Sequence, residues 1–360
     1  MNDKKNILFS EYDMDGLSLR NRVVMAPMTR NFSPNGVPKD YAPTYYARRA
    51  KGGVGLIITE GVEVSHHAAS GYPNCPNLES DDAKRMWEKV VNEVHKNNSS
   101  IFCQLWHVGG IRKPGMPPNP EVPGFTPSGY VRPGKKVAHE MSHEEIQELI
   151  NIYSEDTKAC EELGFDGVEI HGAHGYLIDQ FFWDQINHRD DEYGGTIKNR
   201  SRFASEILQA AKSNTSENFK VGIRISQTKV NNFDYQWPGQ NKDAEAIFSA
   251  LKEIGPTYIH ISTHKGLEEI WESGRNLADW AKTIWEGPTI ACGGLDDPIR
   301  AEELLTQGQA DFIAIAKGAL ADPHWPKKIA SGAIPDPFNP NMIKPYATLQ
   351  NTLDWRLKNN

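Results

Sequence analysis

The sequence predicts an α/β fold, a single (β/α)8 barrel, on three observations. Eight short apolar, β-branched runs recur along the 360 residues, and continuous apolar runs are typical of parallel strands covered by helices. Amphipathic helical patterns lie between most of these runs, which is the alternation of a barrel. A doubly wound sheet would usually carry G-x-G-x-x-G after its first strand, whereas Gly53-Val54-Gly55 lacks the third glycine and precedes its strand.

The expected strands, in chain order, cover residues 23–25, 55–59, 101–105, 167–170, 221–225, 258–261, 289–292 and 312–315. The expected helices cover residues 80–97, 142–163, 199–212, 242–254, 276–286 and 298–307. Ser80 opens the first of these helices. Ser142 followed by Glu145 resembles a capping box at the start of the second, and Gly164 is expected to stop it.

Two segments fall outside the alternation. Residues 108–142 hold 7 of the 23 prolines and 6 of the 30 glycines. Because the alternation resumes in phase beyond them, we interpret them as a loop excursion after the third strand, which could form a wall or lid over the site. The proline-rich tail, 333–360, is expected to pack on the outside or the rim of the barrel. The chain, 1–360, is interpreted as one domain.

The composition restricts the partners and the compartment. The chain carries 39 Lys and Arg against 47 Asp and Glu, a formal net charge of −8, which disfavours nucleic acid because phosphate binding needs a basic face. The four cysteines, at positions 75, 103, 160 and 292, form no C-x-x-C pair, which argues against a zinc ribbon, an iron–sulfur cluster or a disulfide framework. No signal peptide and no run of about 18 apolar residues is seen. We expect a cytoplasmic protein with no nucleic-acid or membrane partner.

Polar residues and glycines follow most of the expected strands, at the end of a barrel where active sites lie. They are Thr29, Glu60, Gly61, Gln104, Trp106, His171, Arg224, Gly293, Gly294 and Lys317. Glycines after the seventh strand and a base after the eighth match the phosphate site of this fold, so the sequence predicts a phosphorylated cofactor. His171 and His174 have no evident third ligand, so no metal site is expected.

Much of the chain resembles the Old Yellow Enzyme family of FMN-dependent ene-reductases. The resemblance runs from about residue 21 to residue 323 and is most specific over 164–177, GFDGVEIHGAHGYL. Further matches are 180–181, 187–189, 191–195, 26–29, 104–107 and 321–323. The resemblance implies a TIM barrel that binds FMN and takes electrons from NADPH or NADH. It also implies reduction of the activated C=C bond of α,β-unsaturated carbonyl compounds by a ping-pong hydride transfer.

Three residues are expected to be catalytic. Hydride addition to an enone puts negative charge on its carbonyl oxygen, and each hydrogen-bond donor placed there can contribute roughly 3 kcal/mol. The resemblance assigns this substrate-binding role to His171 and His174. It assigns protonation of the α-carbon to Tyr176, whose phenol stays protonated at neutral pH. Tyr72 and Trp106 are expected to form walls of the substrate pocket, and ordinary core aromatics are the alternative reading.

The resemblance also implies how FMN is held. Thr29 would bond the flavin near C4=O and N5, Gln104 its pyrimidine edge, and Arg224 the side of N1 and O2. A lysine binds phosphate as a point charge and not as a bidentate fork. Because Ala316-Lys317 departs from the family's usual Gly-Arg, looser FMN binding is expected. The complete expected set is Pro27, Met28, Thr29, Gly61, Gln104, Arg224, Gly293, Gly294, Ala316 and Lys317.

Two alternative functions stay open. One is a reductase mainly of nitro compounds or nitrate esters at the same site, and the other is a non-catalytic flavin-binding sensor. Iron–sulfur relatives of the barrel are disfavoured by the scattered cysteines. Other FMN barrels have no reason to carry His171, His174 and Tyr176 together. Members of the family vary in oligomeric state, so a homo-oligomer stays open as well.

Overall fold

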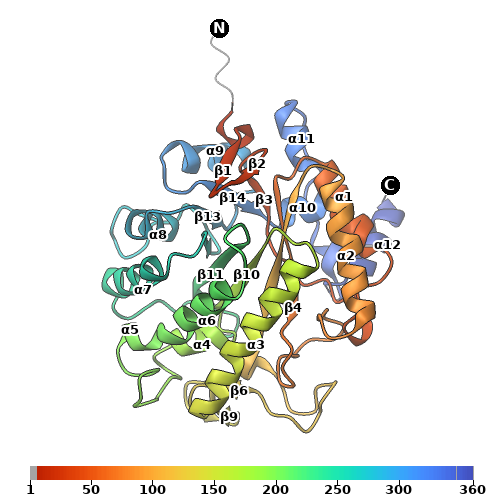
Figure 1. Cartoon of the computed structure of the whole chain (residues 1–360). Helices are drawn as coiled ribbons and strands as arrows, with labels where there is room; N and C mark the ends of the chain where they lie inside the picture. The colour runs from red at the N-terminus through yellow and green to blue at the C-terminus, as the bar shows by residue number, and fades with distance from the viewer. Residues whose placement is uncertain (1–5, 346, 360) are drawn as a thin grey trace.

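The computed structural model describes residues 6–345 and 347–359, and eight parallel strands form a closed barrel at its centre (Figure 1). Each barrel strand pairs with the next one along the chain, and the last pairs with the first. The strands are β3 Val23–Met25, β4 Leu56–Glu63, β5 Ser100–Trp106, β10 Gly167–His174, β11 Lys220–Lys229, β12 Ile259–Ser262, β13 Thr289–Cys292 and β14 Phe312–Ile315. The predicted fold class and all eight predicted strands are confirmed, although β4, β10 and β11 run further than expected.

Helices surround the barrel (Figure 1). The longer ones are α1 Ala42–Lys51, α2 Asp81–His95, α3 His143–Glu162, α6 Arg202–Ser213, α7 Asn241–Ile254, α8 Leu277–Trp285, α9 Pro298–Thr306 and α12 Leu349–Asn359. The shorter ones are α4 Leu177–Phe182, α5 Ile197–Arg200, α10 Lys317–Ala321 and α11 Trp325–Ala330, and the 3-10 turns are η1 Ile7–Phe9, η2 Pro34–Gly36, η3 Gly109–Ile111 and η4 Pro340–Ile343.

The helix starts follow the predicted caps. The Ser80 side chain accepts from the backbone N–H of Ala83. Ser142 and Glu145 form the capping box, because each side chain bonds the backbone N–H of the other. The prediction of one continuous helix over 199–212 was wrong, because the helix is broken at Ser201 into α5 and α6. The Ser201 hydroxyl donates to the carbonyl of Ile197 four residues earlier, a bond that bends helices.

One end of the barrel is closed by a short hairpin that the sequence patterns did not predict. It consists of β1 Tyr12–Met14 and β2 Leu17–Leu19. Met14 and Leu19 are fully buried and join the apolar layer inside the barrel, where Phe102 stacks on Tyr258 at 5.5 Å. This end is therefore packed with side chains, which leaves the carboxyl ends of the strands as the end available for a site.

The excursion lies at the end of the barrel away from β1 and β2 (Figure 1). It contains η3 and four short strands, β6 Phe125–Thr126, β7 Tyr130–Arg132, β8 Lys135–Lys136 and β9 His139–Glu140. β7 and β8 form an antiparallel hairpin, and β6 pairs with β9.

The tail returns to the barrel through α12. The Arg356 guanidinium donates to the carbonyls of Leu320 and Ala321 in α10, and Leu349 N–H donates to the carbonyl of Arg30. The tail 333–360 and the domain 1–360 include residues 1–5, 346 and 360, which lie outside the described residues.

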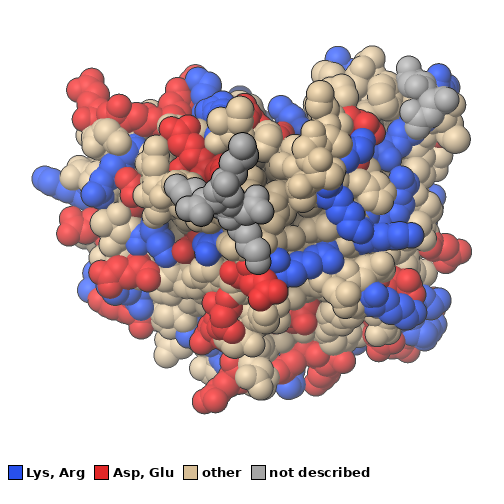
Figure 2. All heavy atoms as spheres, turned by 90° about the horizontal axis from the view of Figure 1, so that it is seen from above, with Lys and Arg blue, Asp and Glu red and all other residues tan. Residues whose placement is uncertain are grey.

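Charge is mixed on the face that lies uppermost in Figure 1. Figure 2 shows lysine and arginine side chains interspersed with aspartate and glutamate over this face. Within 6–345 and 347–359, every helix is too short or too polar to cross a membrane.

Candidate active site

Four predicted site residues meet at the carboxyl ends of β5 and β10. Trp106 is the last residue of β5, His171 and His174 lie in β10, and Tyr176 is the second residue after β10. The ring of Tyr176 lies edge-on to Trp106 at 4.9 Å and to His171 at 5.0 Å, while the two imidazoles are 5.2 Å apart. The four rings therefore form one cluster of contacting side chains.

Tyr72 belongs to the same cluster. Its ring stacks on Trp106 at 5.5 Å, and its hydroxyl oxygen lies 3.2 Å from that of Tyr176. Cys75 and Val108 complete the apolar side of this cluster. Both residues that the sequence suggested as pocket walls are thus placed against Tyr176.

A buried ion pair supports the turn that carries Tyr176. Backbone φ is +63° at His174 and +80° at Gly175, and the β10–β11 register shifts here. The Asp179 carboxylate accepts from Gly175 N–H at 2.6 Å and from Lys229 Nζ at 2.7 and 2.8 Å, and both side chains of the pair are almost fully buried. The pair therefore holds the left-handed turn in place and sets the direction in which Tyr176 leaves the strand.

Both imidazoles are held neutral. Burial, reinforced by the charge of Arg224, lowers the pKa of His171 and of His174 well below the usual 6.5. Nδ1 of His171 accepts from the backbone N–H of Ala173, so the single proton of the neutral ring lies on Nε2. Nε2 of His174 lies 2.9 Å from Oγ of Ser262, which accepts from Arg224. If that hydroxyl donates to Nε2, the His174 proton lies on Nδ1, and each ring then offers one N–H donor.

The phenol of Tyr176 is held protonated. Burial raises its pKa above the usual 10.0, and the neighbouring Tyr72 hydroxyl raises it further. A protonated phenol with few polar neighbours is a proton donor and not a base. The cluster therefore combines two neutral N–H donors with one O–H donor.

A fully buried carboxylate beneath this cluster was missed by the sequence reasoning. Glu169 accepts from Nε2 of Gln104 and Nδ1 of His260, both at 2.8 Å. Burial alone would raise the pKa of Glu169, but His260, Arg224 and Gln104 outweigh it and hold the pKa below the usual value. The available signal was a titratable residue within each of two apolar strands, Glu169 in β10 and His260 in β12. Because Glu169 takes one N–H of the Gln104 amide, the amide oxygen and the second N–H of Gln104 are left for a ligand.

Arg224 has a guanidinium atom left without a partner. It lies in β11 beside His171 of β10, is 6% exposed, and donates through Nη2 to Ser262. Its Nε is buried and has no hydrogen-bond partner within the described chain. An unpaired buried donor of a charged group is costly, which favours an anionic or strongly accepting ligand at this position.

The expected phosphate residues lie together at the ends of β13 and β14. Gly293 and Gly294 follow β13 with φ of +136° and +65°, and a Cβ on Gly293 would lie 2.3 Å from the carbonyl oxygen of Thr263. Ala316 caps α10, and Lys317 begins it with an exposed side chain. Tightly packed backbone and an exposed lysine thus lie together at this end of the barrel, and the Asp296 carboxylate lies against the backbone N–H groups of Ala316 and Gly318.

The segment after β3 is anchored by a buried glutamate. Pro27, Met28 and Thr29 are half-buried, and the next backbone N–H, of Arg30, donates to Glu60 at 2.8 Å. Burial raises the pKa of Glu60 to about 7, and the bond from Arg30 opposes that rise. The sequence analysis placed Gly61 after its strand, but Gly61 lies inside β4. A Cβ there would lie 2.5 Å from the Trp106 ring, so Gly61 lets the indole occupy its place.

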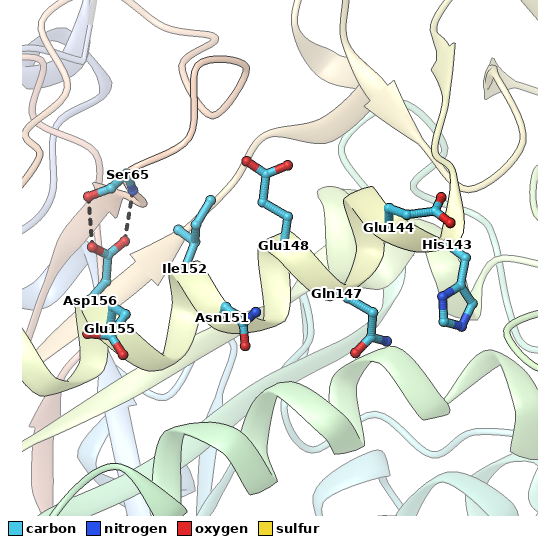
Figure 3. Close-up of a pocket in the computed structure, with 9 residues that line it drawn as sticks. All are labelled: Ser65, His143, Glu144, Gln147, Glu148, Asn151, Ile152, Glu155 and Asp156. Carbon is cyan, nitrogen blue, oxygen red and sulfur yellow. Dashed lines mark hydrogen bonds between the residues drawn. The ribbon is translucent and has the colours of Figure 1, made fainter.

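A cavity of about 570 Å³ on the outside of the barrel is separate from this cluster. It lies along α3 next to Ser65, whose N–H and hydroxyl both donate to Asp156 (Figure 3). Figure 3 shows the other α3 side chains fanning out to both sides of the helix. They do not converge on a common point, and we assign no function to this cavity.

Several known proteins resemble this chain in sequence and in fold. The sequence profile of the NADH:flavin oxidoreductase / NADH oxidase family matches residues 7–335. The chain is 34% identical over 345 residues to putative 12-oxophytodienoate reductase 4 of Oryza sativa subsp. japonica, covering 92% of this chain and 88% of that protein. It is 33% identical to 12-oxophytodienoate reductase 2 of Arabidopsis thaliana, covering 92% and 90%. Among solved structures, morphinone reductase in complex with tetrahydroNAD is similar, with a TM-score of 0.82 and 30% identity over 92% of this chain and 93% of that one.

Proposed function

This chain belongs to the NADH:flavin oxidoreductase / NADH oxidase family and is an FMN-dependent NAD(P)H oxidoreductase of the Old Yellow Enzyme type, and we propose that it reduces the activated C=C bond of α,β-unsaturated carbonyl compounds. The observation that carries the proposal is the contact of His171, His174 and Tyr176 with one another at the carboxyl end of β10, with the imidazoles neutral and the phenol protonated. Two relatives named as 12-oxophytodienoate reductases support the same class of reaction.

The residues at the strand ends fit FMN. Arg224, whose buried Nε has no partner within the described residues, and Gln104 would hold the polar edge of the flavin. Pro27, Met28, Thr29 and Gly61 would lie beside the ring system. Gly293, Gly294, Ala316 and Lys317 would hold the phosphate. When bound, FMN supplies the hydride that adds to the acceptor.

His171 and His174 bind and polarise the acceptor in this proposal. Each neutral imidazole donates one N–H to the carbonyl oxygen of the enone. As hydride adds to the β-carbon, negative charge moves to that oxygen, and the two donors stabilise it more strongly than they stabilise the neutral carbonyl. Their lowered pKa values keep both rings as single donors across the neutral range, and Ser262 and Ala173 fix the ring orientations.

Tyr176 completes the reduction. Its hydroxyl proton passes to the α-carbon, so that the C=C bond gains one hydride and one proton and becomes a single bond. The resulting phenolate then recovers its proton from water. Tyr72, whose hydroxyl touches that of Tyr176, orients the proton before transfer. Trp106 excludes water from one side of the acceptor.

An anaerobic titration tests this function. The purified protein should show the absorption spectrum of bound flavin, lose it on addition of NADPH or NADH, and regain it on addition of cyclohexenone with formation of cyclohexanone. Flavin that is reduced but is reoxidised only by nitro compounds or nitrate esters would overturn the enone assignment. Flavin that no nicotinamide donor reduces would point to a sensor.

A further inference from the structure

A layer of four buried polar side chains crosses the inside of the barrel. Glu169, Gln104, Arg224 and His260 come from four adjacent strands, which are β10, β5, β11 and β12 in that order. Glu169 is the direct partner of Gln104 across β10 and β5, and Arg224 is the direct partner of His260 across β11 and β12. All four side chains are buried. Gln104 and Arg224 are expected to hold FMN, whereas the proposed function gives no role to Glu169 or His260.

The layer holds one negative and one positive charge. Burial alone would raise the pKa of Glu169, but His260 and Arg224 hold it below the usual 4.5, so the carboxylate is ionised. Burial lowers the pKa of His260 below the usual 6.5, so the imidazole is neutral at pH 7. Its Nδ1 donates to Glu169, and its Nε2 is buried with no hydrogen-bond partner within the described residues. Glu169 is therefore the anion that balances the guanidinium of Arg224.

The two charges lie on the same side of the sheet. Glu169 is opposite Gly222 of β11, and Arg224 lies two positions further along that strand. Side chains two residues apart in a strand lie on the same face, so both charges are inside the barrel. Charges removed from water are screened only weakly by solvent and salt. A negative charge at Glu169 therefore weakens the positive potential that Arg224 presents to a ligand.

We propose that Glu169 is a positioning residue that lowers the reduction potential of bound FMN by offsetting the charge of Arg224. Reduction by a nicotinamide donor transfers a hydride, which is two electrons and one proton, so the flavin gains one negative charge. A nearby cation stabilises this charge and a nearby anion opposes it. A lower potential makes the reduced flavin a stronger hydride donor. The inference requires bound FMN and is independent of which acceptor the enzyme reduces.

Glu169→Gln removes the charge and keeps the shape of the side chain. The amide oxygen of the new side chain can accept from Gln104, and its NH2 group can donate to Nδ1 of His260 once the imidazole proton moves to Nε2. We expect reduced FMN to bind about 10-fold more tightly relative to oxidised FMN, which raises the two-electron potential by about 30 mV. A reductive titration of the holoenzyme against a reference dye, followed by absorbance, measures this potential.

Two further variants separate the charge from the structure. Glu169→Asp shortens the side chain but keeps its charge. Tyr258→Phe is the matched control, because the Tyr258 hydroxyl lies 3.4 Å from Oε2 of Glu169 and stays protonated, since burial holds its pKa well above 10.0. In each of these two variants the ratio of the affinities for reduced and oxidised FMN should change by less than about 2-fold.

The proposal is overturned if Glu169→Gln protein retains FMN and has an unchanged or a lower potential. An equal rise in Glu169→Asp would also overturn it, because the effect would then come from the contact with Gln104 and not from the charge. A second comparison applies if Glu169→Gln does not fold. Glu169→Gln combined with Arg224→Gln leaves neither charge buried alone, and its ratio of Kd for oxidised FMN to Kd for reduced FMN should be about 10-fold above that of Arg224→Gln. Equal ratios in these two proteins would contradict the role of the Glu169 charge.

Discussion

The hydroxyl oxygens of Tyr72 and Tyr176 lie 3.2 Å apart, although 104 residues separate them in the chain. Tyr72 stacks on Trp106, and Trp106 meets Tyr176 edge-on. These contacts fix the phenol ring in two directions and place its hydroxyl beside that of Tyr72. We expect this hydroxyl to matter for the step that protonates the acceptor and for no earlier step.

Tyr176→Phe keeps the ring contacts and removes the proton donor. We expect it to slow enone reduction by about 10²–10⁴-fold, which is the rate enhancement that a positioned general acid usually supplies. The rate of flavin reduction by NADPH should change by less than about 2-fold. Stopped-flow measurement of the two half-reactions, each under anaerobic conditions, checks both values.

Tyr153→Phe is the control for that substitution. Tyr153 is fully buried in α3, and its hydroxyl has no hydrogen-bond partner within the described residues. The same atom is removed far from the cluster, so both half-reactions should keep their wild-type rates. Equal slowing of both half-reactions by Tyr176→Phe would show that Tyr176 is structural.

The rate of the enone half-reaction should be independent of pH between about 6.5 and 9. A lowered histidine pKa keeps an imidazole neutral at every pH above it, and a raised tyrosine pKa keeps the phenol protonated at every pH below it. The pKa values of His171 and His174 lie well below 6.5 and that of Tyr176 lies above 10.0, so none of the three changes protonation in this window. A step in the profile near pH 6.5 that His174→Asn removes would contradict this arrangement.

The arrangement of the barrel was predictable because its strands are buried on both faces. Burial on both faces requires continuous apolar runs, and all eight residues of β4 are buried. The caps at Ser80 and Ser142 were predictable because capping uses residues three apart in the chain. The residues at the strand ends could be predicted once the strands were known, because the carboxyl ends of all barrel strands lie at the same end of the fold. Their catalytic and cofactor roles stay predictions.

What could not be predicted depends on contacts between distant residues. Glu169 and His260 are 91 residues apart, and neither position alone indicates that they form a pair. α1 was missed because it buries Tyr45, Tyr46 and Arg49, and a buried arginine disturbs the apolar pattern of a helix. The β1–β2 hairpin was missed although it has a local signal, Asp15-Gly16 between two short alternating runs.

The ion pair between Asp179 and Lys229 should contribute strongly to stability. Lys229→Met leaves the Asp179 carboxylate buried without its partner, and breaking a buried pair in this way costs about 3–5 kcal/mol. We expect a large drop in the thermal unfolding midpoint, and partial recovery when Asp179→Asn is added.

Lys265→Met breaks an ion pair with Glu268 in which both side chains are exposed, so it should cost less than about 1 kcal/mol. A Lys229→Met protein as stable as Lys265→Met would show that the pair is not needed to hold the turn before Tyr176.

Lys317 should determine how firmly FMN is retained. Its exposed side chain lies at the start of α10 beside Ala316, its ammonium group is 5.8 Å from the centre of the Phe338 ring, and it forms no ion pair among residues 6–345 and 347–359. Its charge is thus available for a phosphate. We expect Lys317→Ala to lower the flavin-to-protein ratio after purification and to raise the Kd for FMN by about 10-fold.

Lys317→Arg should retain FMN at least as well as the wild type, because a guanidinium can bind phosphate with two parallel bonds. Lys89→Ala, which removes an exposed lysine of α2 on the outside of the barrel, serves as the control. An unchanged ratio in Lys317→Ala would remove Lys317 from the cofactor site and leave the phosphate to the backbone N–H groups after β13 and β14.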